Sequence, residues 1–175
     1  MKKYVSVLAI ALSCYFISCT NKSEGGLSET AQKNLDAMRG VTKCFDTKDF
    51  SKLDNYIAQD AVDHAGESGD IKGIANMKVQ FEKWVADADN AKTETIKELA
   101  DDEYAMAWQR YTGTYKTDGQ GHKAGDKYDM KSIELAKFKD GKATEHWNFM
   151  EPGDVMKMMG NMQPPKLPAD SSKKM

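Results

Sequence analysis

The chain has 175 residues, of which 40% are hydrophobic and 30% charged, enough apolar material for one packed domain and too much for a wholly disordered chain. Its 25 basic and 27 acidic side chains give a formal charge of −2, which excludes the strongly basic surface typical of nucleic-acid-binding proteins. Three cysteines without CxxC spacing and three widely separated histidines form no recognisable zinc ligand set. We therefore expect one globular domain with no metal, no cofactor and no nucleic-acid partner.

The first 18 residues have the pattern of an export signal. Lys2 and Lys3 precede an apolar stretch over residues 4–17, which matches the charged and hydrophobic regions of a signal peptide. As a helix this stretch would span only about 21 Å of the roughly 30 Å hydrocarbon core of a membrane. A stable transmembrane anchor is therefore not expected.

This segment ends before Cys19 and a polar tether over residues 19–27, and the pattern resembles a bacterial lipoprotein signal. The resemblance implies a lipid on Cys19 and attachment to the bacterial cell envelope, facing the periplasm or the cell surface. Cys14 is a rival lipidation site, and an ordinary cleaved secretory signal is the alternative. With Cys19 lipidated, Cys44 would have no disulfide partner, and its apolar neighbours predict a buried thiol.

Three helices are predicted next. Apolar residues at steps of three and four predict a helix over residues 28–45 and another over residues 71–89. Between them, Asp49 is a candidate N-cap for a short helix that reaches Ile57. A brief extended segment follows at residues 61–65.

The second half of the domain is rich in strand-forming residues. Asp140-Gly141 is typical of a two-residue hairpin turn between the last two strands. A short methionine-rich helix over residues 154–160 and a disordered tail over residues 161–175 complete the chain. We expect an α+β domain over residues 28–160, with a curved antiparallel sheet packed against its helices. The predicted strands are residues 93–99, 103–115, 128–139 and 143–150.

A series of short strings follows in a fixed order along this domain. They are Asp49 to Leu53, Asp60 to His64, Gly73, Tyr111 to Thr114, Asp140 to Lys142, Glu145-His146-Trp147-Asn148 and Gly160. Together they resemble the SnoaL-like polyketide cyclase family of the nuclear-transport-factor-2-like superfamily. The resemblance implies a cone-shaped fold whose sheet and helices enclose an apolar pocket, often in a dimer. It also implies cofactor-free ring closure assisted by an acidic residue, which is Glu151 here where the family carries Asp.

The last predicted strand supplies the first candidate site residue. Trp147 and Phe149 indicate that their face of the strand is the inner one. Glu151 shares that face and would project into the cavity, where desolvation raises the pKa of a carboxyl toward that of a usable acid or base. The alternative is that Glu151 caps the helix begun by Pro152. His146 would then lie on the outer face or at a dimer interface.

The remaining candidates come from other elements. His64 lines the cavity by family resemblance, or is a histidine of a surface turn. Arg110 ends a row of bulky side chains on its strand; facing inward it needs a carboxylate partner such as Glu151 or an acidic ligand, and facing outward it is a dimer contact. The candidate ligand-binding residues are Trp84, for which core packing is the ordinary explanation, Trp108, Tyr115, whose position is usually His in the family, and Trp147.

Two functions are consistent with this pattern. The favoured one is an exported lipoprotein with a SnoaL-like cone domain that binds a small apolar ligand in its pocket, with a homodimer possible. The alternative is a cofactor-free cyclase, isomerase or hydrolase that uses Glu151 as acid or base, with His64 and Arg110 as further catalytic residues. Fold alone does not separate them, because this superfamily supports both uses.

Overall fold

The computed structural model of the chain describes residues 26–66, 68–119 and 121–158. The predicted signal, the predicted lipidation site Cys19, most of the predicted tether and the predicted tail lie outside the described residues. Within the described part of the chain, no helix has the length and apolar character needed to cross a membrane.

Two helices form the layer that packs on the sheet. Helix α1 spans Glu29–Thr47, and its N-cap Ser28 accepts the amide of Ala31 at 3.0 Å, as a capping serine does. Helix α2 spans Ile74–Ala86. The short helix predicted from Asp49 to Ile57 is wrong: only one 3₁₀ turn forms, η1 at Leu53–Asn55. Ile57 instead begins a strand, because it pairs with Ala143 in the sheet.

The sheet has six strands in the order β2-β1-β6-β5-β4-β3. The four predicted strands are confirmed and pair antiparallel in chain order. Two further strands extend the sheet, and β1 lies parallel to β6. The strands are β1 (Ile57–Asp63), β2 (Ile71–Lys72), β3 (Ala88–Ala100), β4 (Tyr104–Tyr115), β5 (Lys127–Lys139) and β6 (Lys142–Met150).

The turn between β5 and β6 is the two-residue hairpin that the sequence predicts. Asp140 and Gly141 have φ values of 54° and 77°, the left-handed conformation that a type I′ turn requires at both positions. The ladder does not continue evenly from this turn. A bulge shifts the register between Lys137 and Phe138, so that Phe138 pairs with Ala143 while Lys137 pairs with Glu145.

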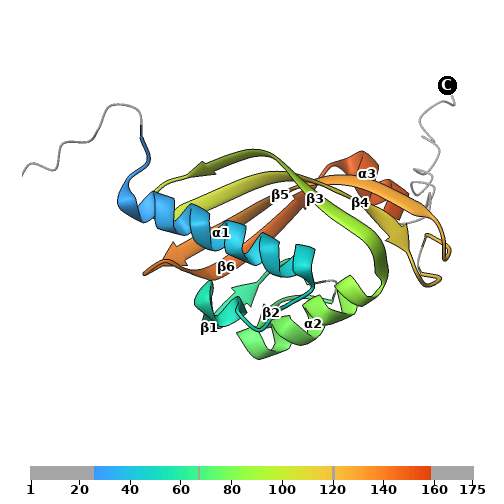
Figure 1. Ribbon diagram of the computed structural model, residues 1–175, viewed down its shortest axis with the longest axis horizontal. Coiled ribbons are helices and arrows are strands. Elements are labelled where there is room, and N and C mark those ends of the chain that lie inside the picture. Colours follow the sequence, from blue (N-terminus) through green and yellow to red (C-terminus); the bar gives the residue numbers. More distant parts are fainter. Residues whose placement is uncertain (1–25, 67, 120, 159–175) are drawn as a thin grey trace, which may run out of the picture.

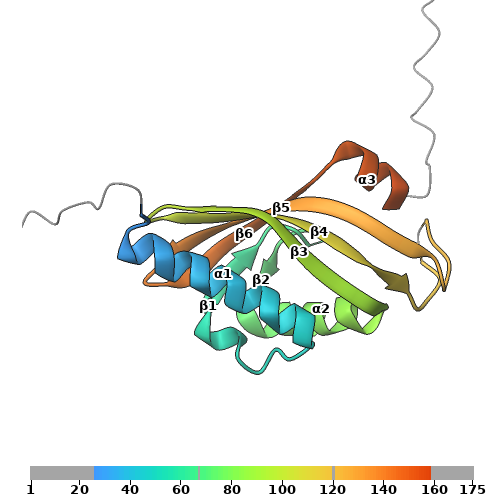
Figure 2. The ribbon, with the colours of Figure 1, turned by 45° about the horizontal axis from the view of Figure 1, so that its top comes forward.

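The sheet curves around α1 and α2, which lie on the same side of it (Figures 1 and 2). The core between these layers includes Met38 of α1 and Phe81 of α2, and the sheet meets it with the alanines Ala105, Ala107 and Ala136. Small side chains there allow the helices to approach the strands closely. The predicted burial of the Cys44 thiol is confirmed.

Helix α3 (Pro152–Met158) follows β6 and lies away from α1 and α2 (Figure 2). The buried carboxylate of Asp154 accepts the backbone amide of Lys131 on β5 at 3.0 Å. This bond comes just beyond the last β5–β6 pair, which joins Ser132 to Met150. Asp154 therefore satisfies a strand amide for which β6 is too short.

Candidate functional site

The β5–β6 bulge decides which side chains of β6 face the helices. Without a bulge, Ala143 and Trp147 would share a face. With it, Ala143 is in the core while His146 pairs with the core residue Ala136, so His146 also lies on the inner face. The prediction that Trp147 and Phe149 face inward is therefore wrong: Phe149 points outward, and 54% of its surface is exposed to solvent.

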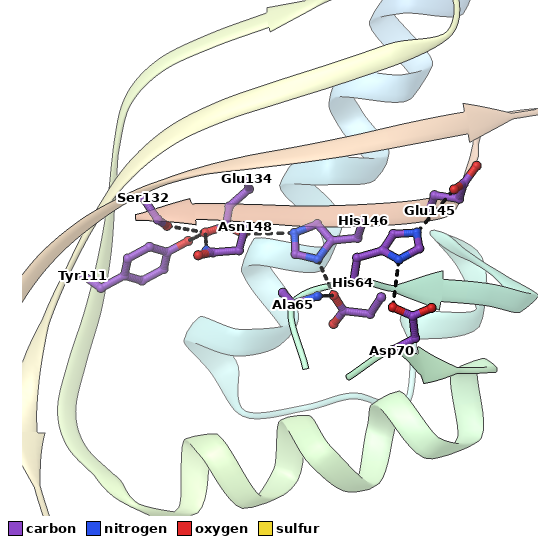
Figure 3. A network of polar contacts seen from close by, with 10 residues as sticks. His64, Ala65, Asp70, Tyr111, Ser132, Glu134, Glu145, His146 and Asn148 are labelled. Carbon is purple, nitrogen blue, oxygen red and sulfur yellow. Dashed lines mark hydrogen bonds and ion pairs between the residues drawn. The ribbon is translucent and has the colours of Figure 1, made fainter. Parts of the chain in front are cut away.

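His146 lies between two carboxylates on this inner face (Figure 3). Its Nδ1 is 2.9 Å from Oδ1 of Asp63, and its Nε2 is 2.9 Å from Oε2 of Glu134. Asp63 reaches this position because β1 runs parallel to β6 and pairs Asp63 with His146. Glu134 comes from β5, the strand on the other side of β6.

Glu134 is the centre of a larger network. Its Oε1 accepts the hydroxyl of Tyr111 at 2.7 Å and the side-chain amide of Asn148 at 2.6 Å. The hydroxyl of Ser132 also donates to Oε1. These side chains share the inner face, since Glu134 pairs with Asn148 in the sheet. We call the set Asp63, Tyr111, Ser132, Glu134, His146 and Asn148 the inner network.

The hydrogen bonds within the network stabilise the ionised forms of His146, Asp63 and Glu134. Burial alone would lower the pKa of His146, but the hydrogen bonds and negative charges of Asp63 and Glu134 outweigh it and raise the pKa to about 9. Burial would raise the pKa of both carboxyls, yet their bonds to His146 lower each pKa below its ordinary value. At neutral pH both ring nitrogens of His146 therefore carry protons and donate.

The inner network is open to the concave interior on one side. The exposed fractions of the His146 and Glu134 side chains are 31% and 17%, whereas that of the Asp63 side chain is only 2%. A hollow of about 230 Å³ extends along β5 to Met130 and is lined by Tyr115, His122 and Tyr128. Met130 pairs with Tyr111 of the network, so the hollow and the network adjoin on the sheet.

Two of the predicted ligand-binding residues lie on the inner side. Tyr115 lines the hollow, with its ring stacked on that of His122 at 3.6 Å between centroids. Trp84 packs against the core, 5.5 Å from the ring of Phe81. For Trp84 the ordinary explanation, core packing, is confirmed.

His64 lies on the opposite face from the inner network, so the expectation that it lines the cavity is wrong. It is the next residue after Asp63, and successive side chains point to opposite faces. Its ring contacts Asp70 at 3.0 Å and Glu145 at 3.3 Å (Figure 3), and it stacks on Trp147 at 5.0 Å between centroids. Its alternative, a histidine of a surface turn, matches the structure.

Arg110 and Trp108 also belong to the outer face. Arg110 forms two hydrogen bonds with the carboxylate of Asp129, at 2.8 and 2.7 Å, and these raise its pKa further. It is therefore a paired cation on the outer face, and of the two alternatives for Arg110 the inward-facing one is wrong. Trp108 keeps 36% of its exposure, and with Trp147 it is placed away from the concave interior.

Glu151 stands between β6 and α3 and is exposed rather than projecting into a cavity. Its carbonyl accepts the backbone amides of Asp154 at 2.9 Å and Val155 at 3.1 Å. This is the bonding of the residue that precedes a helix, as in the helix-start alternative. A catalytic role of Glu151 stays a prediction.

Four of the six inner-network residues, Asp63, Tyr111, His146 and Asn148, lie in the strings that carry the family resemblance, but none of the six is among the predicted site residues. The available signal is the alternation of polar and apolar residues in Ser132-Ile133-Glu134-Leu135, in which the polar residues are the inward ones. That pattern normally indicates a polar face toward water, so it favours the opposite assignment. Among the described residues, no group of three or more His, Cys, Asp or Glu side chains is placed to hold a metal ion.

The family model of the SnoaL-like polyketide cyclases matches residues 35–159, which is most of the chain and includes the whole inner network. The chain belongs to the SnoaL-like polyketide cyclase family. No curated protein matches its sequence significantly.

Solved structures with the same fold are distant in sequence. TsrD from Streptomyces laurentii is 16% identical, with a TM-score of 0.66 over 78% of this chain and 100% of that chain. A SnoaL-like polyketide cyclase from Agrobacterium tumefaciens is 14% identical, with a TM-score of 0.62 over 73% of this chain and 98% of that chain. An LEH-like epoxide hydrolase from M. tuberculosis is 12% identical, with a TM-score of 0.59 over 74% of this chain and 90% of that chain. At these identities the likeness shows the fold, and this SnoaL-like chain shares it with proteins of different named activities.

Proposed function

We propose that this SnoaL-like chain binds a small, largely apolar molecule in the concave interior of its sheet. The observation that carries the proposal is the inner network, which is partly open to the interior beside a hollow of about 230 Å³. Ligand sites in proteins are typically apolar concavities with a few convergent polar groups that fix orientation. The aromatic rings of Tyr115 and Tyr128 supply apolar wall at the hollow.

The protonation of the inner network supports binding more than proton transfer. A general base works best with a pKa near the operating pH. The pKa of His146 is raised to about 9 and that of Glu134 is lowered, so at neutral pH neither group is close to changing its proton. Both nitrogens of His146 also donate to carboxylates, which leaves no imidazole lone pair to accept a proton.

Cofactor-free acid–base catalysis is the second candidate, favoured by family membership and by the Asp63–His146 pair. In this alternative Glu151 acts as acid or base on a cyclisation, isomerisation or hydrolysis. The substitution Glu151→Gln then abolishes turnover of any substrate found and leaves its binding intact. The binding proposal expects no turnover to lose.

The proposal includes the cell envelope as the place of action. The sequence pattern before Cys19 supports export and a lipid anchor, so that binding would occur at the periplasmic or cell surface. A homodimer through the outer sheet face is part of the same proposal, because Trp108, Ile133 and Phe149 leave large apolar side chains exposed there. Sedimentation of the Phe149→Lys variant tests it, with a monomer expected.

Native mass spectrometry of the protein purified from its own host tests the binding proposal. We expect a retained small molecule that is lost from the Tyr115→Ala variant, whose substitution removes a wall of the hollow. Trp108→Ala is the matched control on the outer face and should keep the molecule. A molecule that is retained by Tyr115→Ala and lost from Trp108→Ala would place the site on the outer face and contradict the proposal.

A further inference from the structure

The hydrogen-bond donors of the inner network are almost all engaged within the protein. Both N–H groups of His146 point to carboxylates. The hydroxyl proton of Ser132 goes to Glu134. The single hydroxyl proton of Tyr111 is shared between two acceptors, Oε1 of Glu134 at 2.7 Å and Oε1 of Gln109 at 2.5 Å. Asn148 donates one of its two N–H groups to the same carboxylate. Among the network's side chains as the structure describes them, only the second N–H of Asn148 is left to offer a ligand.

The acceptors of the same network have capacity to spare. A carboxylate has about four lone-pair sites, and an amide or hydroxyl oxygen about two. Oε2 of Glu134 accepts from His146 alone in the network. The oxygens of Tyr111, Ser132 and Asn148 keep lone pairs as well. The network therefore presents acceptors, and few donors, to whatever enters the concave interior.

The net charge of the network also favours a ligand that brings a hydrogen-bond donor over one that brings a negative charge. Asp63 and Glu134 are ionised and His146 is protonated, which leaves one net negative charge. No lysine or arginine side chain is hydrogen-bonded to these residues within the described part of the chain. The negative charge of Asp46 also acts on Tyr111, where it helps to raise the pKa of the hydroxyl. An anion that approached Glu134 would meet repulsion without a free donor to receive it.

We propose that the ligand carries a hydrogen-bond donor on an apolar body, a protonated amine first and a hydroxyl second, and that Glu134 receives this donor. Carboxylic acids and phosphates are disfavoured at Glu134 itself; Lys127 and His122 lie at the hollow, away from this carboxylate. This inference rests on the proposed binding function and names the chemical class that the site takes. It has a consequence for catalysis as well: stabilising the oxyanion of a carbonyl substrate needs free donors aimed at it, and the inner network has almost none.

Calorimetric titration at pH 7 with three probes that share one bicyclic body tests the inference. The probes are 2-naphthylmethylamine, 2-naphthylmethanol and 2-naphthoic acid. We expect the amine to bind most tightly, the alcohol next, and the acid at least about tenfold more weakly than the amine, because only the acid brings a like charge to Glu134. This ranking is measured on the unmodified protein, so it does not depend on any variant folding.

The variant Glu134→Gln identifies the receiving group. It removes the charge and keeps the shape, so the preference for the amine over the acid should fall to less than about threefold. Glu145→Gln is the matched control, because Glu145 lies on the outer face beside His64 and its loss should leave the ranking unchanged. Tightest binding by the acid, or an equal effect of both variants, would overturn the inference while leaving the binding function in place. No binding by any of the three probes would overturn both.

Discussion

Raising the pH from 6 to 9 should destabilise the protein through His146. The pKa of this imidazole is raised from 6.5 to about 9 by Asp63 and Glu134. A group whose pKa is higher in the folded than in the unfolded protein stabilises the fold. This stabilisation is complete at pH values below the unfolded pKa of 6.5 and is lost as the pH rises through the folded pKa of about 9. At about 1.4 kcal/mol for each pH unit, the loss has an upper limit of about 3 kcal/mol. Because 31% of the side chain stays exposed, solvent screening reduces the expected loss to about 2 kcal/mol.

Urea unfolding followed by circular dichroism at pH 6, 7, 8 and 9 measures this loss. The variant His146→Gln should be less stable at pH 6 by about 3 kcal/mol, because it leaves the buried Asp63 without its charged partner, and its stability should change much less with pH. His64→Gln is the matched control: His64 also contacts two carboxylates, but on the exposed outer face. A nitrogen-detected titration of His146 in the unmodified protein gives its pKa directly. A pH dependence that survives in His146→Gln, or a pKa near 6.5, would refute the reasoning.

Three further predictions concern packing and the anchor. Gly113→Ala should cost about 1–3 kcal/mol of unfolding free energy, because its Cβ would overlap the ring of Tyr128, whereas Gly153→Ala, with nothing within 4 Å, should cost almost nothing; equal thermal shifts would contradict this. Ala107→Leu should cost about 1–3 kcal/mol in urea unfolding, because Ala107 is fully buried where the helices meet the sheet; an unchanged midpoint would contradict close packing there. Cys19→Ala should release the protein from the membrane fraction, and a variant that still sediments with membranes at its mature size would contradict the lipid anchor.

The periodic elements could be predicted from the sequence because their signals are local. The apolar stripes of α1 and α2 and the Asp140-Gly141 turn depend on residues close together in the chain. The strand β1 was expected only in part, since most of its pairing comes from β6, more than 80 residues later. Long-range pairing of this kind leaves little trace in a short window of sequence.

The candidate site could not be predicted, mainly because of one bulge. The shift between Lys137 and Phe138 reverses the face of every later residue of β6 relative to Ala143. Without the bulge, the large apolar side chains of Trp147 and Phe149 predict that their face points inward. The close approach of the helices leaves room on the inner face for alanines instead. A histidine and a glutamate are tolerated inside because each satisfies the other. That compensation depends on three strands meeting and has no sequence signal of its own.

The two histidines on opposite faces of the sheet provide the most direct test of where the ligand binds. His146 lies on the inner face and His64 on the outer face, so their imidazole nitrogen resonances report separately on the two sides. During titration of the unmodified protein with 2-naphthylmethylamine, a binding site in the concave interior predicts that the His146 resonances shift with saturation while those of His64 stay in place. Saturable shifts of His64 with His146 unmoved would contradict it and place the site on the outer face.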